Sequence, residues 1–384
     1  MSSATLIHDL AIEFSRMGHE PIVVAPDENI LRDCHVSYEN GIKVLRIKTG
    51  KIKSATRFVR AFNEIKLSRI IWKRGKSFFH ENPCDLIVYY SPSIFFGSLV
   101  KRLKKMFACS AYLILGDIFP QWAVETGVLR KGLIYRYFKY KERQNYEAAD
   151  IIRVQSPANL LYFKDNELDK RYHLEVLYNW TCLTEDTVLP TNYRTRLGLQ
   201  NKVVFFYGGN IGIAQDVDNI IRLADNLRKE TDAYFLLLGG GSEVSRLKAI
   251  IEMKGLTNIS IHDPVDRQEY LSALAEFDVG LISLDRRLRS QNFPGKMMSY
   301  MQKSKPILAS INPGNDLKEM LETNDAGLVC INGEDERFAS YARMLVSDVG
   351  LRKRLGHNGR ALLESTFSVS RAAGQILSHF DHSN

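Results

Sequence analysis

The sequence lacks several features that define common classes of protein. Its five cysteines lie far apart and form no CxxC pair, which argues against a structural zinc site and against a disulfide framework. None of the nine histidines occurs in a metal-binding spacing such as HExxH. The longest uncharged apolar run, 86–100, is too short to cross a bilayer, and the first residues do not resemble a secretory signal. We therefore expect a protein of the reducing cytoplasm.

The chain is long and apolar enough to form two folded domains. It has 384 residues, of which 45% are hydrophobic and 25% charged, as is typical of globular proteins with large cores. Short β-type runs alternate with helical stretches, which predicts an α/β fold in which two Rossmann-like domains with parallel sheets face each other across a cleft. The expected strands span residues 21–25, 43–47, 86–90, 111–115 and 151–155 in the first half, and 203–207, 234–238, 259–262, 279–283, 306–310 and 328–331 in the second.

This alternation divides the chain into three segments. We predict an N-terminal domain over residues 1–182, a C-terminal domain over 183–366, and a tail over 367–384 that packs back on the first domain. A doubly wound domain normally opens with a strand, whereas this chain begins with a helical pattern over 4–17. The first domain is therefore expected to lack its first strand.

Two glycine-rich loops follow successive strands of the second half. Glycine lets the backbone approach an anion closely, and a helix that follows such a loop presents unpaired N–H groups. A tight turn without a ligand is the alternative for either loop taken alone. Because the design is repeated in adjacent units, the pair favours a nucleotide-binding edge. The loop residues of interest are Gly208, Gly209, Asn210, Gly212, Gln215, Gly239 and Gly241.

A lysine opens a later helix of the same half. Lys296 follows Pro294 and Gly295, and a cation at a helix start is unfavourable to the helix dipole. An anionic partner such as a pyrophosphate resolves this conflict, whereas a solvated lysine is the simpler alternative. In the first half, Asp117 follows the strand 111–115, where an acid can hold or deprotonate a hydroxyl, or simply cap a turn before Pro120.

Positive charge is concentrated in one region. Residues 41–110 contain 16 lysines and arginines against three acidic residues, although the net charge of the chain is only +8. Within this region, Phe58, Phe62, Ile65 and Trp72 form one stripe of a helix expected over 54–79, with basic residues around it. The pattern suits an anionic membrane surface, or a docked helix with a solvated basic face. Nucleic acid is the weakest alternative because no nucleic-acid motif accompanies the patch.

These motifs, in this order, resemble the retaining GT-B glycosyltransferases of family four. The resemblance spans nearly the whole chain and is most specific in 117–120, 208–215, the loop 239–241 and the segment 294–306. It is strongest for the branch of bacterial O-antigen and capsule synthesis that includes fucosamine transferases of the WbuB type.

The resemblance implies a UDP-sugar donor on the C-terminal domain, a lipid-linked acceptor on the N-terminal domain, no metal or other cofactor, and a place at the inner face of the bacterial inner membrane. Gly208, Asn210 and Gly212 then line the diphosphate, Lys296 balances its charge, and Asp117 faces the acceptor. The sugar implied is N-acetyl-L-fucosamine or a similar N-acetylated 6-deoxyhexose, and the acceptor is linked to undecaprenyl diphosphate. The family's two glutamates are replaced by Gln291 and Ser299, and its serine before the lysine by Gly295.

Two other functions remain compatible with the sequence. UDP-sugar 2-epimerases share the GT-B fold, but they use acidic and histidine side chains that this sequence does not place in a cleft. A degenerate chain that scaffolds a polysaccharide assembly complex is the other alternative. An epimerase needs no acceptor, and a scaffold binds no UDP-sugar.

Overall fold

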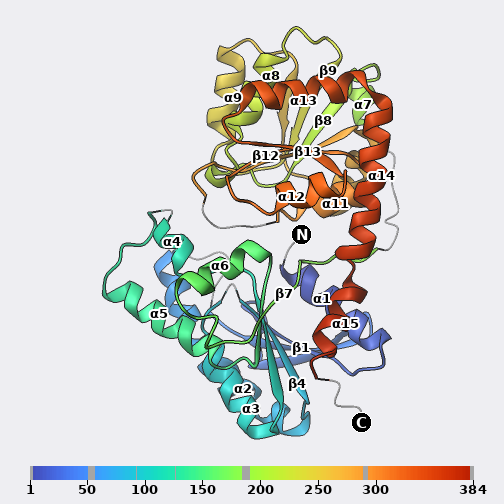
Figure 1. Cartoon of the computed structure of the whole chain (residues 1–384). Helices are drawn as coiled ribbons and strands as arrows, with labels where there is room; N and C mark the ends of the chain where they lie inside the picture. The colour runs from blue at the N-terminus through green and yellow to red at the C-terminus, as the bar shows by residue number, and fades with distance from the viewer. Residues whose placement is uncertain are drawn as a thin grey trace. The chain divides into compact units, whose positions relative to one another are not determined.

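The protein folds into two compact units, which are described separately (Figure 1). The computed structural model describes residues 3–50, 57–91, 93–125, 127–183, 191–288 and 293–380. One unit comprises Trp180–Ser368, and the other comprises the residues up to Asn179 together with those from Val369 onward. The C-terminal helix α15 (Val369–Leu377) therefore belongs to the N-terminal unit, where it contacts α1 (Ser3–Arg16).

The C-terminal unit is built on one six-stranded sheet. Its strand order is β10-β9-β8-β11-β12-β13 and every pairing is parallel. The strand order reverses between β8 and β11, which makes their carboxyl ends the topological switch point where open α/β sheets bind ligands. The strands are β8 (Val203–Gly208), β9 (Ala233–Leu238), β10 (Ile259–His262), β11 (Val279–Ser283), β12 (Ile307–Ile311) and β13 (Gly327–Ile331).

Helices cover this sheet because its strands are apolar on both faces. β11 and β12 are buried at every position, as expected for a parallel sheet enclosed by helices. Phe205 stacks on Phe235 with ring centroids 5.0 Å apart, which ties β8 to β9. The helical elements are α7 (Tyr193–Arg196), the 3-10 turn η1 (Ile213–Gln215), α8 (Asp218–Asn226), α9 (Val244–Met253), α10 (Arg267–Glu276), α11 (Lys296–Gln302), α12 (Leu317–Thr323), α13 (Asp335–Ser347) and α14 (Val349–Thr366).

The N-terminal unit contains two smaller sheets. A parallel sheet has the order β4-β5-β6-β7, and a three-stranded sheet has the order β1-β3-β2. The strands are β1 (Ile22–Asp27), β2 (Cys34–Glu39), β3 (Ile42–Lys48), β4 (Leu86–Ser91), β5 (Ser110–Leu115), β6 (Ile151–Val154) and β7 (Leu174–Val176). The other helices are α2 (Arg57–Glu81), α3 (Gly97–Phe107), α4 (Gln121–Glu125), α5 (Leu133–Tyr146) and α6 (Pro157–Asp165).

Two strands of this unit escaped the sequence prediction. β2 pairs antiparallel with β3, so the sheets are not purely parallel. Asn40 and Gly41 join the two strands with φ of 49° and 81°, the left-handed pair that a tight hairpin requires. This Asn-Gly signal was available in the sequence. The three residues of β7, in contrast, are too few to show a period.

The basic helix α2 is docked by its apolar side. Leu67 and Ile71 are buried, and Trp72 packs against the same core. Trp72 is thus a packing residue here, as in the docked-helix alternative, although Ile65 is exposed. The side chains of Phe58 and Phe62 and the whole of residues 54–56 lie outside the described part of the chain. Within the described ranges, we find no helix with the length and apolar character that a bilayer crossing requires.

Candidate functional site

The candidate site is built on the carboxyl ends of β8 and β9. Beyond β8 the backbone turns at Gly209, whose φ of 118° belongs to the range that favours glycine. The N–H of Gly209 donates to the carbonyl of Leu238 at 2.9 Å, and the N–H of Ile211 donates to the carbonyl of Gly240 at 2.8 Å. These bonds extend the pairing of β8 and β9 into the two glycine loops.

The close approach of these two loops requires glycine. A Cβ atom on Gly239 would lie 1.8 Å from the carbonyl oxygen of Gly209, and one on Gly241 would lie 2.2 Å from that of Ile211. Both contacts are with backbone atoms, which no side-chain rotation relieves. The predicted glycines therefore shape this edge by packing against each other, which leaves the first loop a fixed backbone surface.

The side chain of Gln215 orders the first loop. Its Oε1 accepts hydrogen bonds from Asn210 Nδ2 at 2.8 Å and from the N–H of Gly212 at 3.2 Å. The hydroxyl of Tyr207 donates to the carbonyl of Asn210 at 2.6 Å. Asn210, Gly212 and Gln215 are thus brought together as expected, and the Oε1 of Gln215 is used within the loop.

Lys296 points its ammonium group at this loop. Its Nζ lies 3.3 Å from the centroid of the Tyr207 ring, and a Cβ on Gly209 would stand 3.9 Å from its Cε. The Nζ is buried and has no hydrogen-bond partner among the described residues. Burial lowers the pKa of Lys296 well below its usual value. A buried ammonium satisfied only by a ring face is costly, so this geometry favours an anion between the lysine and the loop.

Two tyrosines connect β8 with α11 and α10. The N–H of Gly208 donates to the hydroxyl of Tyr300 at 3.3 Å, and that hydroxyl donates to the carbonyl of Leu281 at 3.1 Å. A Cβ on Gly208 would lie 2.2 Å from the ring of Tyr270. Burial raises the pKa of Tyr270, and a hydrogen bond with Ser299 opposes that shift. Ser299 therefore interacts with Tyr270 at the position where the family carries a glutamate.

The remaining predicted residues of this segment begin α11. The N–H of Met297 donates to the carbonyl of Pro294 at 2.9 Å, and Gly295 has a helical backbone with φ of −57°. Lys296 follows as the first residue of the helix. Gln291, Asn292 and Arg289 lie outside the described residues.

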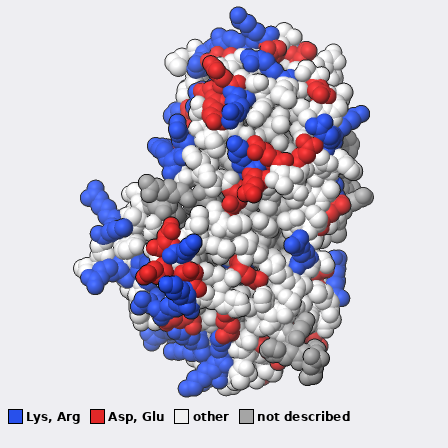
Figure 2. Space-filling view, viewed as in Figure 1, with Lys and Arg blue, Asp and Glu red and all other residues white. Residues whose placement is uncertain are grey.

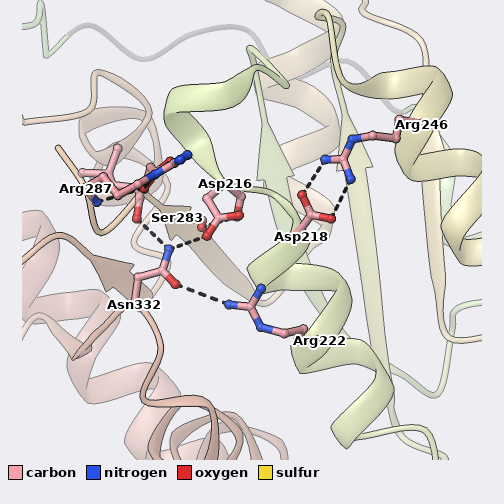
Figure 3. A network of polar contacts seen from close by, with 9 residues as sticks. Asp216, Asp218, Arg222, Arg246, Ser283, Arg287 and Asn332 are labelled. Carbon is pink, nitrogen blue, oxygen red and sulfur yellow. Dashed lines mark hydrogen bonds and ion pairs between the residues drawn. The ribbon is translucent and has the colours of Figure 1, made fainter. Parts of the chain in front are cut away.

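A polar network supports the end of the first loop (Figure 3). Asn332 donates through Nδ2 to Asp216 Oδ2 and to the carbonyl of Leu284, both at 2.8 Å. Ser283 Oγ donates to the carbonyl of Asp216 at 3.0 Å. Asp216 has φ of 39°, so these bonds hold a left-handed residue between η1 and α8. At the edge of the network, Arg246 forms a two-bond ion pair with Asp218.

Asp117 occupies the corresponding carboxyl end in the N-terminal unit. It follows β5 after Gly116, whose N–H donates to the carbonyl of Ser91 at 2.8 Å and whose carbonyl accepts from Gln155 Nε2. Asp117 itself is exposed, but the protein around its carboxyl group raises the pKa of that group by desolvation. A carboxylate with a raised pKa is suited to accept a proton. Among the described residues, no cluster of three His, Cys, Asp or Glu side chains is arranged to hold a metal ion.

A comparison with known families identifies the C-terminal segment. Residues 191–362 match the model of the family described as glycosyl transferases group 1, a range that contains both glycine loops and Lys296. This segment is a group 1 glycosyltransferase domain.

The group 1 domain also has curated relatives. The chain is 28% identical over 262 residues to the probable glycosyltransferase WbjE of Pseudomonas aeruginosa, covering 67% of this chain and 64% of WbjE. It is 29% identical to the putative colanic acid biosynthesis glycosyl transferase WcaI of Escherichia coli K12, covering 37% of this chain and 35% of WcaI. The alignments thus span less than two thirds of the length of these relatives.

Solved structures confirm the predicted α/β GT-B fold. Sucrose-phosphate synthase of Thermosynechococcus elongatus superposes with a TM-score of 0.74 at 16% identity, covering 100% of this chain and 94% of that one. Anabaena HepE in complex with UDP-glucose superposes with a TM-score of 0.61 at 17% identity, covering 81% of this chain and 82% of HepE. Identities this low support the fold and leave the substrate open.

Several residues of the group 1 domain were missed by the sequence analysis. Tyr207, Tyr270 and Tyr300 enclose the β8 end, and Asn332 and Asp216 fix the loop from behind. Tyr300 lies within the recognised segment 294–306, and Tyr207 ends the expected strand 203–207, but neither side chain was given a role. The others come from distant parts of the chain, and no local pattern marks a side chain that acts through a tertiary contact.

Proposed function

We propose that the protein is a retaining glycosyltransferase that moves a sugar from a UDP-sugar to a lipid-linked oligosaccharide. The observation that carries the proposal is the buried Nζ of Lys296, which lacks a hydrogen-bond partner among the described residues and lies beside Gly209 at the switch point of the sheet. The diphosphate of a nucleotide-sugar supplies the negative charge that this arrangement requires.

The proposed nucleotide-sugar donor fits the shape and charge at the carboxyl end of β8. The glycines from Gly208 to Gly212 give an anion close access to the backbone, although most N–H groups of this loop are already bonded within the unit, and Lys296 offers a cation. The uridine part of the proposal is supported by a similar solved structure, Anabaena HepE, which contains UDP-glucose. Under this proposal Lys296 regains its charge when the diphosphate binds, because the anion offsets the desolvation of the ammonium.

The chemistry then depends on the leaving group. When the glycosidic bond to the diphosphate breaks, negative charge grows on the phosphate oxygen, and Lys296 stabilises this charge more strongly than it does in the ground state. Retention is explained if the acceptor hydroxyl attacks the same face of the sugar and the leaving phosphate oxygen takes its proton. Asp117 would then orient the acceptor.

The names of the relatives support a place in surface polysaccharide synthesis. WcaI is described as a colanic acid biosynthesis enzyme, so an acceptor linked to undecaprenyl diphosphate is the natural choice. We propose N-acetyl-L-fucosamine, or a similar N-acetylated 6-deoxyhexose, as the sugar, and a peripheral position on the inner face of the inner membrane. The exposed basic side chains of α2 are one candidate contact with anionic lipid.

Replacing Lys296 by alanine tests the proposal. Lys296→Ala should lower kcat by about 100-fold or more, the usual effect of removing a group that stabilises a developing anion. The control is Lys303→Ala, at the other end of α11, which should leave turnover and UDP affinity unchanged. A Lys296→Ala protein that retains most of its activity contradicts the proposed site.

Two further outcomes point to a different function. Release of an isomerised sugar in the absence of any acceptor identifies an epimerase. Absence of UDP binding in calorimetry with the intact protein identifies a scaffold.

A further inference from the structure

The segment that links α4 to α5 in the N-terminal unit carries an exposed apolar stripe. We define the outer stripe as Val128, Leu133, Ile134, Tyr137 and Tyr140. Their side chains are 61%, 83%, 63%, 37% and 54% exposed. Leu133 and Ile134 are adjacent at the start of α5, Tyr137 follows them at four- and three-residue intervals, and Tyr140 comes three residues after Tyr137, so the four lie on one side of that helix. An apolar surface gathered on one helix face calls for a partner.

The opposite side of α5 is already occupied by the core. Phe138 contacts Phe119 and Phe95 with ring centroids 5.1 and 6.3 Å away. Glu142 and Tyr146, one and two turns further along that side, are buried. The helix is therefore held in place from within, and of the outer stripe only Tyr137 touches this packing within the described part of the chain, through the ring of Phe138 at 5.8 Å between centroids. The apolar residues of the stripe need a different explanation.

Positive charge surrounds the stripe. Residues 127–141 include five basic residues and no acidic one. Lys139 is paired with Glu142, and no other ion pair found among the described residues involves this segment. Lys141 lies over the rings of Tyr137 and Tyr140, with its Nζ 5.8 and 5.3 Å from their centroids. Figure 2 shows basic side chains projecting from the edge of the unit where Figure 1 places α4 and α5.

A hollow opens beside the stripe. It has a volume of about 330 Å³, and Arg136, Arg143, Tyr135 and Tyr140 are in its lining. Glu142 also contributes, but Lys139 offsets its charge. The stripe and the hollow combine exposed aliphatic residues, tyrosines at their margin and guanidinium groups that form no ion pair among the described residues. These three kinds of group match the acyl chains, the interface and the phosphate headgroups of a bilayer surface.

We propose that the outer stripe, together with Arg130 and Lys131, docks the N-terminal unit on an anionic lipid bilayer. This docking rests on the proposed function, in which the acceptor is linked to a lipid. Asp117, the residue proposed to orient the acceptor, lies only a few residues before α4, and Phe119 contacts α5. Docking through the stripe brings the acceptor-binding part of the chain to the surface where its substrate resides. The lipid contact itself needs no turnover, so it is testable separately.

The test is binding of the full chain to vesicles of equal parts phosphatidylglycerol and phosphatidylethanolamine, with phosphatidylcholine vesicles as the neutral comparison. Leu133→Ser/Ile134→Ser should weaken binding to the anionic vesicles by roughly tenfold or more, because two exposed aliphatic side chains no longer enter the interface. Arg130→Glu/Lys131→Glu should have a similar effect that diminishes at high salt.

Matched controls lie on the C-terminal unit. Met253→Ser removes an apolar side chain that is 79% exposed, and Lys229→Glu/Lys353→Glu reverses two exposed charges. Both controls should bind vesicles like the unmodified protein. UDP binding should be unchanged in all four variants, which separates a failure of docking from a failure of the proposed donor site.

Three results overturn the proposal. They are no vesicle binding by the unmodified protein, equal binding by the stripe variants, and a dimer that becomes a monomer in Leu133→Ser/Ile134→Ser without any change in vesicle binding. The last result assigns the stripe to a second copy of the chain.

Discussion

The pKa of the candidate charged residue is shifted in opposite directions in the two units. In the C-terminal unit, burial against Tyr207 lowers the pKa of Lys296, whereas in the N-terminal unit desolvation raises the pKa of Asp117. Both shifts favour the neutral form. The amine of Lys296 is buried beside Tyr207, and the protein around Asp117 desolvates its carboxyl group although the residue as a whole is exposed. The same physical effect, loss of hydration, thus acts on both groups, and in the proposed function the lysine receives a phosphate and the carboxyl group holds a hydroxyl.

Removing the carboxylate should give the largest difference between the units. Asp117→Asn should lower kcat by about 100-fold while UDP affinity is unchanged, because the neutral amide loses the charge-assisted hydrogen bond that orients the acceptor hydroxyl. In the unmodified protein, activity should fall as pH drops through the raised pKa of Asp117. Steady-state kinetics across pH, with calorimetry of UDP binding, checks both. A loss of UDP affinity equal to the loss in kcat would contradict the division of roles.

Disturbing the backbone contact between the loops should affect only the C-terminal unit. Gly239→Ala places a Cβ 1.8 Å from the carbonyl oxygen of Gly209, so it should lower the free energy of unfolding by about 1–3 kcal/mol and weaken UDP binding. The matched control is Gly240→Ala, whose Cβ would lie 3.5 Å from the ring of Pro264, an ordinary contact. Thermal unfolding and calorimetry distinguish them, and equal effects of both variants would argue against tight loop packing.

The protonation of Lys296 should depend on its ligand. Above its lowered pKa the unliganded side chain is neutral, and bound UDP restores its charge, so binding should take up a proton. In the unliganded protein, the unfolded state binds this proton more tightly, so stability should rise with pH between the lowered folded pKa and the ordinary lysine value. Calorimetry in buffers of different ionisation enthalpy measures the uptake. Lys296→Met should abolish it, and uptake that persists in this variant would assign the proton elsewhere.

The smallest expected effect is the difference in stability between two variants of the network in Figure 3. Asn332 is buried and donates two hydrogen bonds, so Asn332→Ala should lower the free energy of unfolding by about 1–3 kcal/mol. The Arg246 side chain is 48% exposed, so loss of its ion pair in Arg246→Ala should cost about 0.2–1 kcal/mol. Denaturant unfolding of both variants gives the comparison. A larger cost for Arg246→Ala would mean that the edge of the network supports the loop more than its centre does.

Much of the C-terminal unit was predictable from sequence because its signals are local. Each predicted strand of the second half coincides with a strand of the sheet, since buried parallel strands are continuous apolar runs. The glycine loops and Lys296 were visible as short motifs between strands and helices. Strand order was not visible, and it is the order that places the β8 loop at the switch point.

The N-terminal unit was less predictable because its contacts are less local. The hairpin of β2 and β3 depended on a two-residue turn. The sequence left open whether Trp72 faces a membrane or packs against the core, and in the structure it packs against the core. The outer stripe of α5 was not recognised either. In sequence, its apolar residues are interleaved with those of the inward face, and only the fold shows which of the two faces is covered.

The sequence by itself determined the fold class, the glycine loops and the candidate charged residues, because periodicity and backbone freedom are properties of a few neighbouring residues. The tertiary structure decided what those residues face. It buried the ammonium of Lys296 against Tyr207, pressed Gly239 against Gly209, turned Ser299 towards Tyr270 and left the outer stripe uncovered. Each of these depends on atoms far apart in the chain, and burial, unlike periodicity, exists only once distant segments have packed together.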